Sequence, residues 1–145
     1  MKKKGAASEV SQGRDQELMR LYHKAMSIAY ADRDKRYTVR DIYVIVSMLS
    51  CNRYYISEDN AWRYVNERMR GKKTISIKGK RRCLYETLYA KVMQLKLQSD
   101  NAMCATRTLV YRVMQQEAPC IGLSPERIRS EIERIKRAIR NNGQQ

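Results

Sequence analysis

Basic side chains in one central stretch are the residues of this chain whose type and spacing could do chemistry. Residues 63–82 read R-Y-V-N-E-R-M-R-G-K-K-T-I-S-I-K-G-K-R-R and hold nine Lys or Arg against one acid, Glu67. This gives the segment a net charge of +8, more than half of the +15 that the 145-residue chain carries. Like charges repel one another and destabilise a compact fold unless an anionic partner neutralises them. The segment therefore predicts a binding site for a polyanion.

The two halves of this segment suit different contacts with nucleic acid. Before Gly71, a predicted helix carries Arg63, Asn66 and Arg70 on one face, where Arg suits guanine or phosphate and Asn suits adenine. After Gly71, glycine-flanked cations can follow a phosphate backbone without a fixed geometry. We predict phosphate contacts from Lys72, Lys73, Lys78, Lys80, Arg81 and Arg82. A solvated charged loop is the alternative interpretation of these six residues.

Two adjacent tyrosines come just before the predicted helix. Tyr54 and Tyr55 could stack on unpaired bases or donate hydrogen bonds to phosphates. The alternative is that they close the gap between two helices. Tyrosine occurs ten times in the chain and phenylalanine is absent, so many of these rings are expected at half-buried boundaries.

Side chains for catalysis or metal binding follow no recognisable pattern. The one histidine, His23, has no Ser, Cys or acid at a catalytic spacing. The acids of D-R-D-K-R at 32–36 predict a local ion-pair cluster rather than a metal site. The four cysteines form no C-x-x-C pair, which predicts small, buried, apolar residues in a reducing compartment: Cys51, Cys83, Cys104 and Cys120. We therefore expect no enzyme, no cofactor and no metal.

Capping signals and apolar spacing predict the helices that position the basic segment. An amphipathic stripe predicts a first helix over 15–31. Thr38 with Asp41 forms a capping box that starts a helix over 39–50, although its β-branched centre also suits a buried strand. Ser57 is the N-cap of a helix over 58–70, with Gly71 beyond its end.

The helices over 39–50 and 58–70 resemble a helix-turn-helix pair, in which the second helix enters the major groove of DNA. Ala61, Val65 and Met69 would be the inner stripe of this second helix. About seven residues connect the two helices, however, where the usual turn has three or four. The pair is therefore a hypothesis that depends on an unusually long turn.

The second half of the chain predicts three further helices and a connecting segment. T-I-S-I at 74–77 predicts a short wing strand or an extended linker. A helical stripe follows over 84–98, and a helix restarts at Asp100 or Asn101 and continues to Met114. The last helix, 125–140, has Ser124 as its N-cap and one isoleucine face, which packs on the body of the protein or forms a homodimer: Ile128, Ile132, Ile135 and Ile139.

These signals together predict an all-α fold of about six helices. We expect a flexible arm over 1–13, a single helical domain over 14–140 and a frayed tail over 141–145. No stretch has the apolar core of an export signal or the length of a membrane span. A cytoplasmic protein, or one inside a virion, is the expectation.

One resemblance adds to this interpretation. R-Y-Y-I-S-E-D-N-A at 53–61, followed by a basic stretch and by K-R-R-C-L-Y-E at 80–86, resembles a pattern in small uncharacterised basic proteins of bacteriophages and mobile elements. The resemblance covers about a quarter of the chain and implies a phage-type origin. It transfers no site residue.

The function predicted from the sequence is non-enzymatic binding of nucleic acid through residues 63–82. Duplex DNA is favoured over RNA, for which the tyrosines would matter more. The alternative is a helical assembly or virion protein that uses the isoleucine face of residues 125–140.

Overall fold

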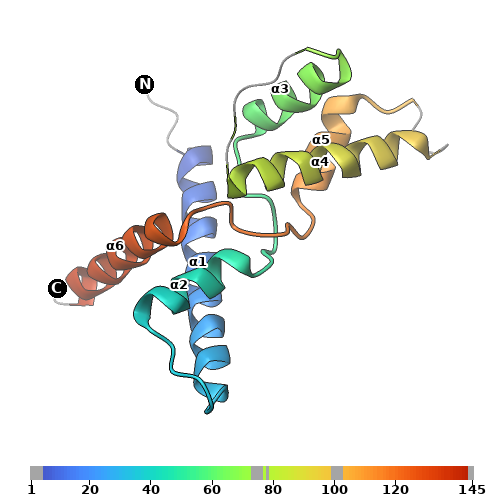
Figure 1. The fold of residues 1–145 in the computed structure, drawn as a ribbon. Helices are drawn as coiled ribbons and strands as arrows, with labels where there is room; N and C mark the ends of the chain where they lie inside the picture. Colours follow the sequence, from blue (N-terminus) through green and yellow to red (C-terminus); the bar gives the residue numbers. More distant parts are fainter. Residues whose placement is uncertain (1–4, 73–76, 78, 99–102, 144–145) are drawn as a thin grey trace. The chain divides into compact units, whose positions relative to one another are not determined.

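Six α-helices form the regular structure of the residues described by our computed structural model, which are 5–72, 77, 79–98 and 103–143 (Figure 1). The prediction of an all-α fold with about six helices is confirmed. No β-strand occurs among these residues, and one isolated pair of backbone hydrogen bonds joins Cys51 to Ala118. The helices are α1 (Gly5–Ala31), α2 (Val39–Met48), α3 (Glu58–Met69), α4 (Lys80–Leu97), α5 (Thr106–Met114) and α6 (Pro125–Gly143).

The helices group into two compact units. Unit 1 comprises residues 1–49 and 123–145, and unit 2 comprises residues 50–122. In unit 1, α1 packs against α2 and α6, and α2 also packs against α6. In unit 2, α3, α4 and α5 each pack against the other two. The single helical domain predicted over 14–140 stays a prediction.

The apolar core of unit 1 includes the isoleucine face of α6. Ile128 and Ile132 are fully buried and Ile135 is nearly so, whereas Ile139 is 59% exposed. The first three isoleucines therefore pack on their own chain, which is one of the two alternatives that the sequence left open. This leaves Ile139 as the exposed member of the surface predicted for a homodimer.

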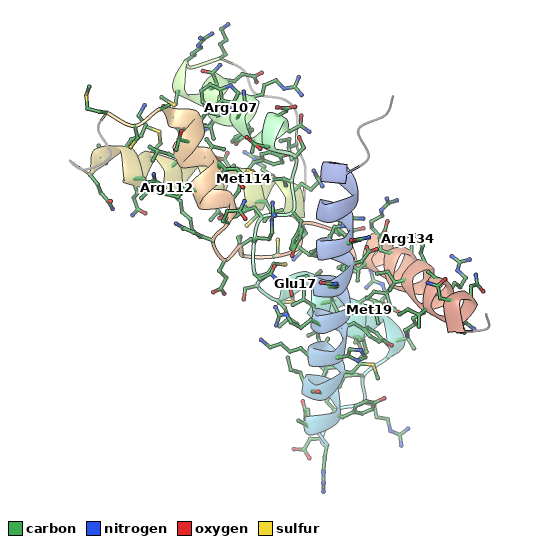
Figure 2. The ribbon with its side chains drawn as sticks, turned by 180° about the vertical axis from the view of Figure 1, so that it is seen from behind. Glu17, Met19, Arg107, Arg112, Met114 and Arg134 are labelled. Carbon is green, nitrogen blue, oxygen red and sulfur yellow. The ribbon has the colours of Figure 1, made fainter. Side chains whose placement is uncertain are left out.

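Charged side chains join α1 to α6 at the edge of this core. Glu131 of α6 is buried, and Arg134, which is labelled in Figure 2, donates to its carboxylate at 2.8 Å and to Asp15 of α1 at 2.8 Å. Arg14 and Arg127 lie 3.5 and 3.1 Å from the same carboxylate. Burial raises the pKa of Glu131, but the hydrogen bond from Arg134 and the charges of the three arginines outweigh it, so this pKa lies below its usual range. Glu131 therefore stays ionised and fixes α6 on α1.

The predicted helix caps are present. Thr38 and Asp41 form the full capping box at α2, and Ser57 accepts a hydrogen bond from the backbone of Asn60 at α3. The hydroxyl of Ser124 accepts from the backbone of Arg127 in the first turn of α6. These local hydrogen bonds satisfy backbone groups that every helix start leaves free, which is why the sequence alone could place the three helix starts.

Several boundaries differ from the prediction; among them, α2 ends at Met48 and α4 begins at Lys80. Residues 5–13, expected as an arm, belong to α1, because Ala, Ser, Glu and Gln extend a helix that residues 15–31 have already nucleated. Residues 103–105 are not helical, and α5 begins at Thr106, because the chain must reverse before α5 can pack on α4. At the other end of the chain, α6 continues to Gly143.

The strand predicted at 74–77 lies outside the described residues except for Ile77, which is not in a strand. In the part of the chain that the structure describes, no helix is long and apolar enough to cross a membrane.

Candidate nucleic-acid interface

The relation between α3 and α4 determines where the basic residues lie. Arg68 is 3.2 Å from Glu86, and the rings of Tyr64 and Tyr85 are 5.2 Å apart. Each pair joins a residue of α3 to one about twenty positions later, so the two helices run in the same direction. The end of α3 therefore lies beside the middle of α4, and the start of α4 lies toward the start of α3.

This parallel arrangement separates the predicted phosphate contacts into two groups. Arg70 and Lys72 follow the last turn of α3, and Lys80, Arg81 and Arg82 form the first turn of α4. We call these two groups the basic ends. All five residues are exposed. Because α3 has 12 residues and a helix rises 1.5 Å per residue, α3 is about 18 Å long and lies between the two basic ends.

The first basic end is held by a specific helix termination. After the C-cap Arg70, Gly71 takes a positive φ of 69°, and the N–H of Lys72 donates to the carbonyl of Glu67 at 2.9 Å. The N–H of Gly71 donates to the carbonyl of Arg68 at 3.1 Å. These two bonds form a Schellman motif, which glycine allows because it has no Cβ. The backbone that carries Arg70 and Lys72 is therefore fixed up to residue 72.

The second basic end lies at an unfavourable position for cations. The N-terminus of a helix carries partial positive charge, and α4 has no acidic residue in its first turn. Its N-cap, Gly79, makes no side-chain cap hydrogen bond. Lys80, Arg81 and Arg82 make no ion pair with any described residue, and their like charges repel one another.

The exposed face of α3 carries the three side chains predicted to contact bases. Arg63, Asn66 and Arg70 recur at i, i+3 and i+7, and the buried residues of α3 lie on the opposite side: Ala61, Tyr64 and Val65. Arg63 and Arg70 are exposed and Asn66 is half-buried. The guanidinium of Arg63 donates to Asn60 at 2.9 Å, a bond that stays on the surface. Met69, predicted for the inner stripe, is exposed, and Tyr64 occupies the core instead.

The proposed helix-turn-helix pair gains no support from the packing. In that motif the two helices pack on each other within one domain. Here α2 belongs to unit 1 and α3 to unit 2, and the packing partners of α3 are α4 and α5. The candidate interface therefore consists of α3 and α4 rather than α2 and α3.

Arg68 is the basic residue of the segment that the fold uses for itself. Besides its ion pair with Glu86, its guanidinium lies 4.6 Å from the centre of the Tyr89 ring. These contacts join α3 to α4, so one of the nine cations of residues 63–82 has a structural role within the fold. Lys73 and Lys78, two other predicted phosphate contacts, lie outside the described residues.

The prediction that Tyr54 and Tyr55 contact nucleic acid is contradicted, because both side chains are buried. The backbone N–H of Tyr54 donates to the carbonyl of Met114 at 3.0 Å, so this segment faces the core of unit 2. The hydroxyl of Tyr55 donates to Asn52 at 2.6 Å. Burial raises the pKa of Tyr54 to about 12. The two rings fill the space between helices, as the alternative interpretation held.

The Tyr54 hydroxyl is buried without a hydrogen-bond partner among the described residues, which yields a stability prediction. A buried hydroxyl without a partner costs roughly 1–3 kcal/mol in desolvation. We expect Tyr54→Phe to raise the free energy of unfolding by about 1 kcal/mol, measured by urea denaturation. The matched control is Tyr55→Phe, which removes the hydrogen bond to Asn52 and should lower the same quantity by about 1 kcal/mol. A clear loss of stability in Tyr54→Phe would contradict this assignment.

Two further predictions about reactive side chains need correction. Cys51 and Cys120 are buried as expected, but Cys83 is exposed and Cys104 is partly exposed. The acids and bases at 32–36 do not form the expected ion-pair cluster, because no carboxylate oxygen and basic nitrogen of this loop lie within 4 Å of each other. Instead, Asp32 accepts hydrogen bonds from the Tyr37 hydroxyl and from the Asp34 backbone N–H. No group of metal-ligating side chains occurs in the described part of the chain.

A pocket in unit 1 is the site that the sequence did not indicate. It has a volume of about 460 Å³ and is lined by the second half of α1, the loop over 32–38 and the start of α2. One signal was available: Tyr22, Met26 and Tyr30 recur at i, i+4 and i+8 next to the buried stripe of the first helix. Which residues of the loop face them could not be deduced from local sequence.

Comparison with known proteins gives no family: no family model, curated protein or solved structure matches this chain. The resemblance to small basic phage proteins stays a prediction carried by the residues quoted for it.

Proposed function

We propose that this protein binds nucleic acid without catalysis and that its ligand is duplex DNA, held by the basic ends of α3 and α4. The observation that carries the proposal is the concentration of exposed cations at these two helix ends. Five of them make no ion pair with any described residue: Arg70, Lys72, Lys80, Arg81 and Arg82.

The energetic argument concerns Lys80, Arg81 and Arg82. Each cation in the first turn of a helix is destabilising by roughly 0.3–1 kcal/mol at low salt, because it faces the positive end of the helix dipole. Three consecutive cations also repel one another. A phosphate at this position would offset both the unfavourable interaction with the helix dipole and the mutual repulsion of the cations. It would pair with the cations and with the free N–H groups of the first turn.

The length of α3 suits contact with both strands of a duplex. The major groove of B-DNA is about 12 Å wide between its phosphate walls. Because α3, about 18 Å long, exceeds this width, cations beyond its two ends can contact phosphates on both sides of the groove. This arrangement would turn the exposed face with Arg63, Asn66 and Arg70 into the place for base contacts.

Two observations weigh against the other functions considered. The buried Tyr54 and Tyr55 offer no ring for stacking, which removes the residues on which an RNA-binding alternative depended. The assembly alternative retains only Ile139 of its four isoleucines as an exposed side chain.

The salt dependence of binding tests the proposal directly. Each neutralised phosphate of duplex DNA releases counterions and contributes about −0.9 to the slope of log K against log salt. Five cations at the basic ends predict a slope of about −4.5, measured by fluorescence anisotropy of a labelled duplex. An affinity that does not change between low and high salt would contradict the proposal.

A further inference from the structure

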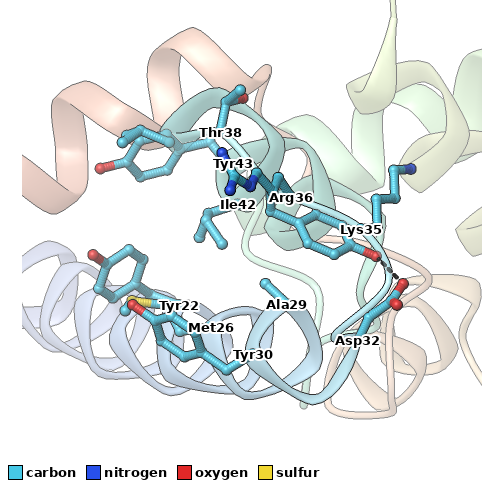
Figure 3. A pocket seen from close by; sticks show the side chains of 12 residues that line it. Tyr22, Met26, Ala29, Tyr30, Asp32, Lys35, Arg36, Thr38, Ile42 and Tyr43 are labelled. Atoms are coloured by element: carbon cyan, nitrogen blue, oxygen red, sulfur yellow. Dashed lines mark hydrogen bonds between the residues drawn. The ribbon is translucent and has the colours of Figure 1, made fainter.

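The pocket of unit 1 lies between an aromatic helix face and a basic loop. Figure 3 shows Tyr22, Met26, Ala29 and Tyr30 projecting from α1 on one side, with Ile42 facing them from α2. Its volume of about 460 Å³ falls within the range of small-molecule sites, roughly 300–1,000 Å³. The pocket belongs to a different unit from the basic ends, so it needs an explanation of its own.

Tyrosine rings form much of the pocket wall. The rings of Tyr22 and Tyr43 stack with centroids 6.1 Å apart and planes inclined by 19°. The ammonium of Lys136 donates to the Tyr22 hydroxyl at 2.9 Å, which fixes that ring. Tyr30, in contrast, is 74% exposed at the rim, where a large ring is in contact with water. A flat ligand could cover Tyr30 and bury its ring surface.

The loop contributes charge to the same pocket. Lys35 and Arg36 are exposed pocket-lining residues that make no ion pair with any described residue. The Lys35 ammonium lies 5.3 Å from the centre of the Tyr37 ring. The Tyr37 hydroxyl donates to Asp32 at 3.0 Å, which anchors the loop and, as the main cause, raises the pKa of Tyr37. Arg36 beside a pocket lined by tyrosine rings favours a ligand that is both aromatic and anionic.

We propose that this pocket binds a nucleotide: the base lies against the tyrosine rings and the phosphate pairs with Arg36. Any base can stack on a tyrosine ring, and this stacking contributes measurably to binding affinity. Lys and Arg are the usual partners of phosphate. Asp32 retains acceptor capacity for an exocyclic amino group of the base, because an ionised carboxylate offers about four lone-pair sites. The ligand is either a free nucleotide or an unpaired nucleotide within a strand.

The test uses the full chain and adenosine monophosphate, with binding followed by isothermal titration calorimetry. Adenosine supplies the base without the phosphate, and ribose 5-phosphate supplies the phosphate without the base. We expect each fragment to bind at least about tenfold more weakly than the nucleotide, because each loses one of the two contacts. Equal binding of nucleotide and ribose 5-phosphate, or no binding of the nucleotide at millimolar concentration, would overturn the proposal.

Matched substitutions locate the binding site. Tyr30→Ala should weaken nucleotide binding about tenfold, whereas Tyr111→Ala, at an exposed tyrosine of α5, should leave it unchanged. Arg36→Ala should weaken it, whereas Arg33→Ala, in the same loop but outside the pocket lining, should not. All four residues are exposed, so the substitutions should preserve the fold. Equal losses in the targeted and control variants would overturn the site.

Two further measurements separate the ligand sources and the two proposals. Competition between adenosine monophosphate and a short oligo(dA) strand identifies the tighter ligand, and hence the free or the strand-borne nucleotide. Tyr30→Ala should retain salt-dependent binding of duplex DNA. If nucleotide binding fails while duplex binding persists, the pocket proposal is wrong and the proposed function stands. If the nucleotide binds and duplex DNA does not, the proposed function is wrong and the pocket proposal stands.

Discussion

Replacing Lys72, Lys80, Arg81 and Arg82 together by alanine is expected to lower the affinity for duplex DNA about 100-fold. Each exposed charge contact contributes roughly 0.7 kcal/mol, and four such contacts amount to two orders of magnitude in Kd. The loss should be similar for every DNA sequence, because contacts with phosphate carry no sequence information. Fluorescence anisotropy at fixed salt measures the loss, and the slope of log K against log salt should become shallower by about 3.6.

This variant should fold at least as well as the natural chain. None of the four side chains makes an ion pair with a described residue, and three of them face the positive end of α4. Alanine is also the best helix former for the first turn of α4. A thermal melt that shows equal or greater stability would therefore assign the lost affinity to the missing charges.

The matched control removes four exposed cations from unit 1. Lys24, Arg33, Arg137 and Arg140 make no ion pair with any described residue, and their replacement by alanine lowers the formal net charge by the same four units. If the basic ends are the binding site, this control should lose only a fewfold in affinity through long-range attraction. An equal loss in both variants would show that net charge alone, rather than the ends of α3 and α4, attracts the DNA.

The second large effect concerns the stability of unit 2. Gly122→Ala is expected to lower the free energy of unfolding by about 3 kcal/mol. Gly122 has a positive φ of 82°, a conformation that costs an L-residue roughly 1–2 kcal/mol. A Cβ at this position would also clash with the Cδ1 atom of Leu84, which is fully buried in the core. Overpacking of this kind adds roughly 1–3 kcal/mol.

Gly71→Ala is the control that separates backbone strain from the clash. Gly71 has a similar φ of 69°, but a Cβ there would meet nothing within 4 Å. This substitution should therefore cost only about 1 kcal/mol, which is the strain term alone. Urea denaturation gives both values from the midpoint and the slope of the transition. Equal costs at the two glycines would contradict the close packing of Gly122 on Leu84.

Features that depend on neighbouring residues could be predicted from the sequence. The starts of α2, α3 and α6 follow from Thr38, Ser57 and Ser124, because a cap joins a side chain to a backbone N–H only three residues away. The shared outer face of Arg63, Asn66 and Arg70 follows from helical periodicity. The charge excess of residues 63–82 needs no structure at all.

Features that depend on residues far apart in the chain could not. Burial of Tyr54 and Tyr55 depends on a hydrogen bond to Met114, sixty positions away. The division of the basic segment into two ends depends on the parallel packing of α3 and α4, which no local pattern encodes. The pocket also combines a helix face with a loop whose orientation follows from the bond between Tyr37 and Asp32.

The sequence by itself therefore determined that this chain is helical and that it concentrates positive charge in one segment. Only the tertiary structure decided which of those charges are available to a ligand. Arg68 is engaged with Glu86 and Tyr89, whereas Lys80, Arg81 and Arg82 make no ion pair with any described residue. The physical reason is that charge is a property of composition, whereas its neutralisation depends on which side chains the packing of α3 on α4 brings within a few ångströms.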